Sequence, residues 1–410
     1  MINLYIFNES SRASVYGIGT YIAELRKALR DSDINVYVVN LYAENQKNVA
    51  EETQAIRLLY IPSPVIQNTT FDRDKHNKQY YRNVVYLLRL KIVSAENLVF
   101  HLNYNQSGPL AVELKKAFDC KVVTVVHYSE WGSVIFDNLN RLRSILYNDI
   151  SDDFSKKLKN SFEEEKLLYS MTDKVVCLSN YMKEILCLDY EIKATKISVI
   201  PNCINDTGKT MTENKTLRKK WKITLIEKII LFAGRMEEIK GMEFLLKAFR
   251  KVLSTYPNSR LIIVGEGGFN KYSKESQDFC TKITYTGMLN KAKLYELYCL
   301  ADVGVIPSLF EPFGYVAVEM MMHELPVVVT STSGLNEVVD DTCGLKVPII
   351  KYSDKVEIDD GLLAEKIIFL LQNPSEAKMI GENGRKRFLK EYSSEVFHRK
   401  MLEFYHSLFS

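Results

Sequence analysis

The sequence predicts an α/β protein with two domains, each built on a parallel sheet. Its 410 residues exceed what one ordinary hydrophobic core holds. Short apolar runs alternate with amphipathic helical patterns from end to end, which is typical of parallel sheets in α/β folds. Hydrophobic residues make up 46% of the chain and charged residues 26%, as in soluble globular proteins.

The apolar runs form two series separated by a polar stretch. The first series predicts strands at residues 4–7, 36–39, 58–61, 98–101, 122–127, 174–178 and 197–200. The second predicts strands at residues 229–232, 261–264, 283–286, 303–306 and 327–330. A polar linker is expected within 201–215. We expect a Rossmann-like domain at 1–205, another at 206–385, and a C-terminal helix at 386–410 that packs back on the first domain.

Glu311 and Glu319 stand on either side of a predicted junction between a strand and a helix. Pro312 marks the expected helix start, which places Glu311 at the helix mouth and Glu319 about two turns inside. Ligands of open α/β sheets bind at the carboxyl ends of the strands, where helix N-termini hold phosphates. Carboxylates there suit ribose and pyranose hydroxyls, so the pair predicts a sugar-nucleotide site. Taken singly, each glutamate is more often a solvated surface group.

Two cations follow the first strand of the second series, at the edge where anions bind. Arg235 and Lys240 can together hold a diphosphate that gains negative charge as it leaves. Either cation alone would be read as a solvated surface charge. The glycine-rich stretch 265–268 follows the next strand and fits a tight turn and part of a cleft equally well.

Three residues of the first series extend the candidate site. Gly17 and Gly19 begin a helix after the first strand, and glycines there let backbone amides approach a phosphate. Ile22 replaces the third glycine of a dinucleotide fingerprint, so this signal is weak alone. His127 ends a strand at the carboxyl edge of the sheet. A lone histidine is more often a structural hydrogen-bonding group, and its position makes it a candidate.

Composition and motifs also narrow the partners. A net charge of +3, without a basic run interleaved with aromatic residues, argues against nucleic acid. The string Asp72-Arg73-Asp74 has the form of a divalent-metal motif but follows no apolar strand, so we expect no metal. No signal-peptide pattern and no apolar window of about 18 residues is present in the sequence. We expect a cytoplasmic protein with reduced cysteines, either free or in peripheral contact with the inner face of the membrane.

Together these segments resemble family 4 of the retaining glycosyltransferases, also called group 1, which have the GT-B fold. The resemblance covers nearly the whole chain, and residues 3–12 are similar to bacterial members. It rests on three motifs: Ile197–Asn202, Gly234-Arg235 with Lys240-Gly241, and Glu311-x7-Glu319. It implies two Rossmann-like domains whose parallel sheets face each other across a cleft.

The resemblance also implies a role for each charged candidate. Glu319 would bind the nucleotide ribose, and Glu311 would bind a hydroxyl of the donor sugar. Arg235 and Lys240 would hold the diphosphate. His127 would face the transferred sugar near its anomeric carbon.

Backbone contacts are implied as well. The amides of Phe313, Gly314 and Tyr315 would lie close to the donor. Gly17 and Gly19 would let the first domain approach the diphosphate.

The chain departs from the family pattern at three points. Cys203 stands where glycine usually follows Pro-Asn, and Ser333 stands where a glycine pair is common. Glu130 is the first acidic residue after His127 but is not adjacent to it. The substitutions at Cys203 and Ser333 remove no charged contact. Because Glu130 is not adjacent to His127, the resemblance does not specify the sugar contacts around His127.

The sequence therefore predicts an enzyme without metal or cofactor that transfers a hexose from a nucleoside diphosphate sugar, UDP- or GDP-linked, to an acceptor hydroxyl with retention. The acceptor is left open among a saccharide, a lipid-linked molecule, a peptide and a small molecule, and residues 8–16 are expected to form an acceptor-side loop. The alternatives are a sugar-nucleotide epimerase of the same fold and an inactive partner subunit. An NAD-dependent dehydrogenase is the weakest alternative, because neither half has a complete glycine fingerprint.

Overall fold

The computed structural model describes residues 1–9, 17–43, 49–53, 56–63, 73–92, 94, 96–148, 152–208 and 214–410. The chain divides into two compact units. The first comprises Met1–Glu130, Asp149–Cys203 and Ser394–Ser410, and the second comprises Trp131–Asn148 and Ile204–Ser393. The boundaries between the units lie at 203/204 and 393/394, whereas the sequence predicts 205/206 and 385/386. The assignment of 131–148 to the second unit was not expected.

The first unit is built on an eight-stranded sheet in the order β3-β4-β2-β1-β5-β6-β7-β8. Its neighbouring strands are parallel except for β3, which is antiparallel to β4. The strands are β1 (Ile2–Glu9), β2 (Ile34–Ala43), β3 (Val49–Thr53), β4 (Ile56–Pro62), β5 (Leu98–Leu102), β6 (Lys121–Val126), β7 (Lys174–Cys177) and β8 (Ile197–Val199). The seven expected strands are confirmed. The edge strand β3 was missed because its sequence, VAEET, is short and lacks a clear apolar pattern.

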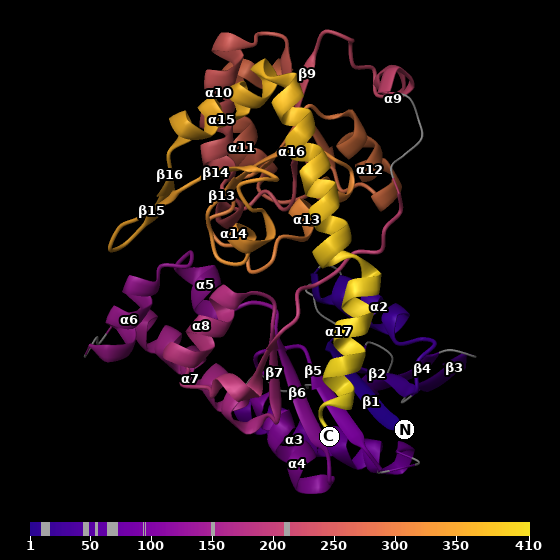
Figure 1. Cartoon of the computed structure of the whole chain (residues 1–410). Helices are drawn as coiled ribbons and strands as arrows, with labels where there is room; N and C mark the ends of the chain where they lie inside the picture. The colour runs from indigo at the N-terminus through magenta and orange to yellow at the C-terminus, as the bar shows by residue number, and fades with distance from the viewer. Residues whose placement is uncertain are drawn as a thin grey trace. The chain divides into compact units, whose positions relative to one another are not determined.

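The helices of the first unit form two groups (Figure 1). Helix α2 packs against α17, while α3, α4 and α7 contact one another in series. The elements are α2 (Gly17–Ala28), α3 (Arg73–Lys91), α4 (Gly108–Ala117), α7 (Asp153–Met171), α8 (Asn180–Leu188), the short η1 (Ala194–Lys196) and α17 (Ser394–His406). Helix α17 is tied to the sheet by Tyr405, whose hydroxyl lies 2.8 Å from Nδ1 of the buried His101 at the end of β5.

The second unit has a six-stranded parallel sheet in the order β11-β10-β9-β12-β13-β14, with a separate antiparallel hairpin, β15-β16. The strands are β9 (Lys228–Ala233), β10 (Ser259–Val264), β11 (Ile283–Gly287), β12 (Val303–Ile306), β13 (Val327–Thr330), β14 (Leu345–Val347), β15 (Ile349–Lys351) and β16 (Val356–Ile358). The five expected strands are confirmed, and β14 to β16, of three residues each, were missed. With both sheets in place, the predicted α/β class is confirmed.

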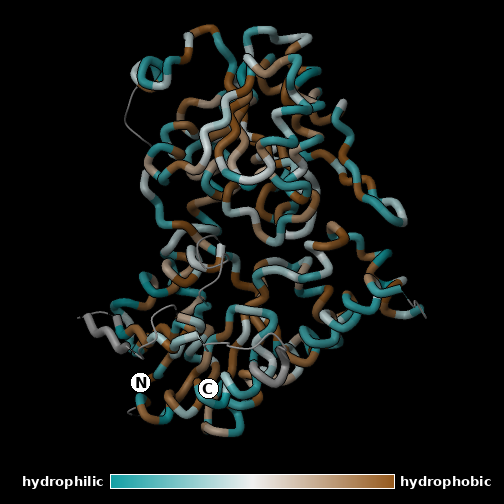
Figure 2. Tube along the Cα trace, turned by 180° about the vertical axis from the view of Figure 1, so that it is seen from behind, coloured by the Kyte–Doolittle hydropathy of each residue, from teal (hydrophilic) through white to brown (hydrophobic). Residues whose placement is uncertain are grey.

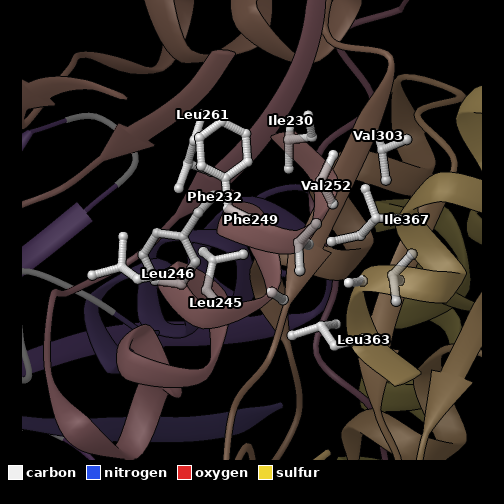
Figure 3. Close-up of a cluster of buried hydrophobic side chains, with 14 of the residues drawn as sticks. Ile230, Phe232, Leu245, Leu246, Phe249, Val252, Leu261, Val303, Leu363 and Ile367 are labelled. Atoms are coloured by element: carbon white, nitrogen blue, oxygen red, sulfur yellow. The ribbon is translucent and has the colours of Figure 1, made fainter. Parts of the chain in front are cut away.

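The second unit also contains helices and short helical turns. They are α5 (Glu130–Val134), α6 (Leu139–Tyr147), α9 (Asn214–Lys220), η2 (Glu238–Lys240), α10 (Met242–Thr255), α11 (Phe269–Glu275), η3 (Gln277–Lys282), α12 (Lys291–Leu300), α13 (Tyr315–Met322), α14 (Leu335–Val338), α15 (Asp360–Gln372), α16 (Pro374–Arg387) and η4 (Phe388–Tyr392). Figure 3 shows the core between α10, α15 and the strands, where Phe249 and Ile367 are fully buried. Segment 131–148 joins this unit through Asn138, whose Nδ2 donates to the Tyr352 carbonyl at 2.6 Å.

The C-terminal helical pattern is interrupted. Helix α16 leads into the π-helical turn η4, and α17 begins anew at Ser394. Ser393 is extended at the break, with ψ 157°. The segment 386–410, for which one C-terminal helix was expected, comprises the end of α16, the turn η4 and helix α17.

Hydropathy follows the layers within each unit (Figure 2). The strands are mainly hydrophobic, and hydrophilic residues are concentrated on helices and loops. Among the described residues, no helix is long and apolar enough to cross a membrane. The carboxyl ends of the buried strands are therefore the places where polar side chains can gather beside the core.

Candidate functional site

Glu311 lies in the loop between β12 and α13, and Ser333 fixes its backbone. The Glu311 amide donates to Ser333 Oγ at 3.1 Å, and Ser333 Oγ donates to the Glu311 carbonyl at 2.9 Å. Ser333 has a positive φ of 36°, which favours glycine and explains why glycine is common there. Ser333 adopts this unfavourable backbone conformation, and its hydroxyl forms two hydrogen bonds with the Glu311 backbone. The sequence did not predict this contact.

Lys240, the last residue of η2 in the connection after β9, reaches the same loop. Its Nζ is 2.5 Å from Oε2 of Glu311, and the two side chains are 21% and 18% exposed. The approach depends on Gly241, which has φ 67° and whose added Cβ would lie 1.8 Å from the Pro307 carbonyl oxygen. The Leu309 amide donates to the Ile239 carbonyl at 2.8 Å and holds the two loops together. The structure thus places one cation and one carboxylate side by side at the carboxyl edge of the second sheet.

Glu319 lies deeper, on α13, beside a different cation. Its side chain is 7% exposed and lies 2.5 Å from Lys291 Nζ through Oε1. Tyr298 donates to its other oxygen at 3.0 Å. Because α13 begins at Tyr315, Glu319 is its fifth residue and lies about one turn inside. The expectation of two turns was wrong, because Pro312 precedes the helix and does not begin it.

The N-terminus of α13 carries the predicted backbone positions. Gly314 caps the helix in the left-handed region with φ 102°, and Tyr315 follows as the first helical residue. Amides in a first helical turn have no intrahelical acceptor, so this end can receive an anion. The ring of Phe313 is buried and packs edge-on against Tyr315 and Tyr392. Phe313 thus anchors the turn from which these amides extend.

Arg235 differs from Lys240 in its partner. Its guanidinium lies 3.0 Å from the carboxylate of Glu237, two residues along the same loop. The structure therefore joins Lys240 to Glu311, and Arg235 to Glu237. The stretch 265–268 forms a tight turn against the Arg235 loop, since the Met236 amide donates to the Glu266 carbonyl at 2.8 Å.

His127 follows β6 in the first unit. Its Nε2 lies 3.0 Å from Asn103 Oδ1, and its ring packs edge-on against Tyr21 with centroids 4.7 Å apart. Asn103 donates through Nδ2 to the Phe7 carbonyl at 2.9 Å, which turns its oxygen toward the histidine. His127 therefore donates from Nε2 and keeps Nδ1 as an acceptor. Burial, reinforced by the nearby His101, lowers the pKa of His127 to about 3, so the ring is neutral at physiological pH.

The remaining sequence candidates are placed as follows. Gly17 and Gly19 are the first and third residues of α2. Residues 10–16, which include most of the expected acceptor-side loop, lie outside the described residues, as does Asp72 of the metal-like string. Within the described ranges, no group of three or more His, Cys, Asp or Glu side chains could hold a metal ion.

Two family models match the sequence, one in each half. The model described as Glycosyltransferase Family 4 matches residues 15–207, and the model described as Glycosyl transferases group 1 matches residues 213–387. The chain belongs to the family 4 glycosyltransferases. Members of this family are retaining enzymes that transfer a sugar from a nucleotide sugar, and the predicted family is confirmed.

Relatives and solved structures agree with this assignment. An uncharacterized glycosyltransferase of Methanocaldococcus jannaschii is 37% identical over 175 residues, which cover 40% of this chain and less than half, 44%, of that relative. Sucrose-phosphate synthase from Thermosynechococcus elongatus superposes with a TM-score of 0.78 at 22% identity over 100% of this chain and 99% of that chain. Anabaena HepE in complex with UDP and glucose superposes with a TM-score of 0.72 at 16% identity over 99% and 100%. The predicted GT-B fold is confirmed.

Several contacts of the candidate residues were missed by sequence reasoning. Lys291 and Tyr298 of α12 bind Glu319, and Ser333 and Asn103 fix Glu311 and His127. Lys291 had a usable signal, since it follows Asn290, a helix cap just after the end of β11. The others depend on contacts between distant segments, which no local pattern reveals.

A buried carboxylate supports the loop after His127. Glu165 on α7 accepts from Asn105 Nδ2 at 2.7 Å and from the Glu130 amide at 3.1 Å, and the Tyr190 hydroxyl also donates to it. Asn105 in turn donates to the Tyr128 carbonyl at 2.9 Å. Glu165 therefore fixes the start of α5 and the end of β6 together.

Glu165→Gln is expected to stabilise the glycosyltransferase at alkaline pH. Burial raises the pKa of Glu165 from 4.5 to about 7, against the effect of its hydrogen bonds. A raised folded-state pKa gives stability that is complete below the unfolded value and is lost as pH rises through about 7. A neutral glutamine escapes that loss, so the variant should gain up to about 3 kcal/mol relative to wild type between about pH 5 and about pH 8.

Urea unfolding at the two pH values measures this change, and Glu164→Gln on the exposed side of the same helix is the matched control. A gain of equal size at both pH values would show that ionisation of Glu165 is not its cause.

Proposed function

We propose that the chain transfers a hexose from a nucleoside diphosphate sugar, UDP- or GDP-linked, to an acceptor hydroxyl with retention and without a metal ion. The observation that carries the proposal is the pair of carboxylates on the second sheet, each beside a lysine. Lys240 lies 2.5 Å from Glu311, and Lys291 lies 2.5 Å from Glu319. Carboxylates bind hydroxyls and cations bind phosphates, so one edge offers both halves of a sugar-nucleotide site.

The proposed roles of the second-unit residues follow from these positions. Glu319 binds the ribose, and Glu311 binds a hydroxyl of the donor sugar. Lys240 and Arg235 bind the diphosphate, and each gives up its contact with a carboxylate to do so. Their positive charges take the role that a metal ion has in other transferases. Further hydrogen-bond donors for the diphosphate are the backbone amides of Phe313, Gly314 and Tyr315 at the helix N-terminus.

The first-unit residues contribute the other proposed roles. His127, neutral and held by Asn103, presents its Nδ1 acceptor toward the transferred sugar. Gly17 and Gly19 place no side chain at the first and third positions of α2, where a diphosphate would approach.

The proposed reaction needs no enzymic nucleophile. The bond between the anomeric carbon and the phosphate oxygen breaks with its electron pair on the phosphate. The acceptor oxygen bonds to the same face of that carbon, and the acceptor proton passes to the leaving phosphate. Lys240 and Arg235 stabilise the charge that develops there.

The acceptor class is a matter for experiment among a saccharide, a lipid-linked molecule, a peptide and a small molecule. HepE was solved with UDP and glucose, which supports starting with UDP-glucose as the donor. We propose a cytoplasmic location, free or in peripheral contact with the membrane.

Nucleotide binding tests the proposal directly. A thermal-shift screen with UDP, GDP, ADP and their common sugars, with and without EDTA, should find one nucleotide that raises the melting temperature, since a ligand of the folded state stabilises it. Lys240→Ala is expected to reduce that shift and to lower turnover about 100-fold, because it removes a cation from the leaving phosphate. The exposed Lys378→Ala on α16 is the matched control.

Three results would contradict the proposal. Full turnover in Lys240→Ala would exclude the diphosphate role. Release of an epimer without any acceptor would identify the chain as an epimerase, and absence of binding by every nucleotide would favour an inactive partner subunit.

A further inference from the structure

Lys291 reaches the buried carboxylate of Glu319 from a separate helix. It is the first residue of α12, directly after Asn290, whose side chain caps the helix by accepting from the Lys293 amide at 3.0 Å. The Lys291 side chain is 56% exposed, whereas that of Glu319 is 7% exposed. A solvent-facing ammonium therefore covers a carboxylate that is otherwise enclosed by the protein.

The orientation of the carboxylate is fixed from both sides. Lys291 lies 2.5 Å from Oε1, and Tyr298 donates to Oε2 at 3.0 Å. The Lys291 ammonium also lies 5.9 Å from the ring centroid of Tyr295, within the range of a cation–π interaction. An ionised carboxylate has about four lone-pair positions and an ammonium has three donors, so both groups keep hydrogen-bonding capacity for a ligand.

We propose that Lys291 is a second ribose-binding residue and that the Lys291–Glu319 pair recognises the vicinal hydroxyls of the donor ribose. A hydroxyl is both donor and acceptor, so it can donate to Glu319 while it accepts from Lys291. A 2′-deoxyribose cannot satisfy both partners, and a polar group left without its partner weakens binding. The pair therefore selects ribose over deoxyribose. This inference rests on the proposed function of Glu319.

Lys291 is suited to a binding role more than to a structural one. An ion pair whose cation is exposed adds little to folding stability, because water screens it and the lysine loses side-chain freedom. Without Lys291, Glu319 still accepts from the buried Tyr298 hydroxyl. Loss of the lysine should leave the fold intact, so its effect on a ligand can be measured separately.

Calorimetry with UDP and 2′-deoxy-UDP tests the proposal in the full chain. If the screen selects another base, its diphosphate and 2′-deoxy form replace them. We expect Lys291→Met to raise the Kd for UDP about tenfold and the Kd for 2′-deoxy-UDP much less, so that the preference for ribose falls severalfold. Lys291→Arg should restore most of the preference. Lys293→Met, an exposed lysine two positions along α12, should leave both Kd values unchanged.

Glu319→Ala distinguishes failure of this inference from failure of the proposed function. If Lys291→Met leaves the UDP Kd unchanged or lowers it while Glu319→Ala weakens binding, Lys291 only covers the carboxylate, and the ribose site stands without it. An equal loss for UDP and 2′-deoxy-UDP in Lys291→Met would overturn the recognition of the diol. If Glu319→Ala also leaves the UDP Kd unchanged, the ribose site itself is wrong, and both proposals fall.

Discussion

Glu319→Ala is expected to lower nucleotide affinity about 100-fold or more and to abolish measurable sugar transfer. The change removes the proposed acceptor of the ribose hydroxyls, and charge-assisted hydrogen bonds of this kind are strong. It also leaves the Lys291 ammonium without its counter-ion and the buried Tyr298 hydroxyl without its partner. Ligand and protein groups thus lose their partners together. Calorimetry with the selected nucleotide and single-turnover assays measure the effect.

Two variants separate recognition from damage to the fold. Glu319→Gln keeps an acceptor for Tyr298 but loses the charge, so it should fold like wild type and still bind the nucleotide more weakly. Glu365→Ala removes an exposed glutamate on α15 and should change neither property. Wild-type affinity in Glu319→Ala, with a normal melting temperature, would rule out the ribose role.

The sheets could be predicted from sequence because their strands are compact apolar runs. The segments 229–232 and 303–306 carry consecutive apolar residues, and all four residues of β12 are buried in the structure. Strands of a parallel sheet are covered by helices on both faces, so all their residues are buried and apolar. Such a run can be recognised from the sequence of the strand alone. The sequence of β3, VAEET, and the three-residue strands β14 to β16 have no such apolar run, so they could not be predicted from the pattern.

The two glutamates could be predicted as a pair, but their partners could not. Glu311 and Glu319 belong to one short segment, and their position after β12 follows from the strand and helix pattern. Lys240, Lys291 and Ser333 come from three other segments, which follow the strands β9, β11 and β13. Their contacts arise only when these strands bring the segments to one edge of the sheet. Sequence spacing does not encode which lysine meets which glutamate.

The helix start was misplaced for a backbone reason. Proline is favoured in the first turn of helices, so the sequence predicts that the helix starts at Pro312. The helix begins after Gly314, which adopts a left-handed φ of 102° as its cap. Gly334 allows this arrangement, because any Cβ there would lie 1.9 Å from the Pro312 carbonyl oxygen. The loop from residue 311 to 314 is therefore shaped by a close backbone contact with the segment after β13.

Gly241→Ala is expected to destabilise the second unit by at least about 2 kcal/mol and to disrupt nucleotide binding. A left-handed φ of 67° costs an L-residue about 1 kcal/mol by itself. The added Cβ would also lie 1.8 Å from the Pro307 carbonyl oxygen, a backbone atom that cannot move aside without displacing the loop after β12. That loop carries Glu311, and Gly241 directly follows Lys240. Denaturant unfolding and nucleotide calorimetry measure the two effects.

Gly287→Ala is the matched control because it introduces the same left-handed backbone strain without a steric overlap of the added Cβ. Gly287 has the same φ of 67°, and none of the described atoms lies within 4 Å of its added Cβ. Its substitution should therefore cost only the left-handed strain, and the difference between the two variants gives the energy of the contact between the Lys240 and Glu311 loops. If both variants lose the same stability, the loops can separate at little cost, and the ion pair between Lys240 and Glu311 is not held by the close approach at Gly241. If Gly241→Ala loses more stability and more nucleotide affinity, the backbone contact is what sets the distance between cation and carboxylate.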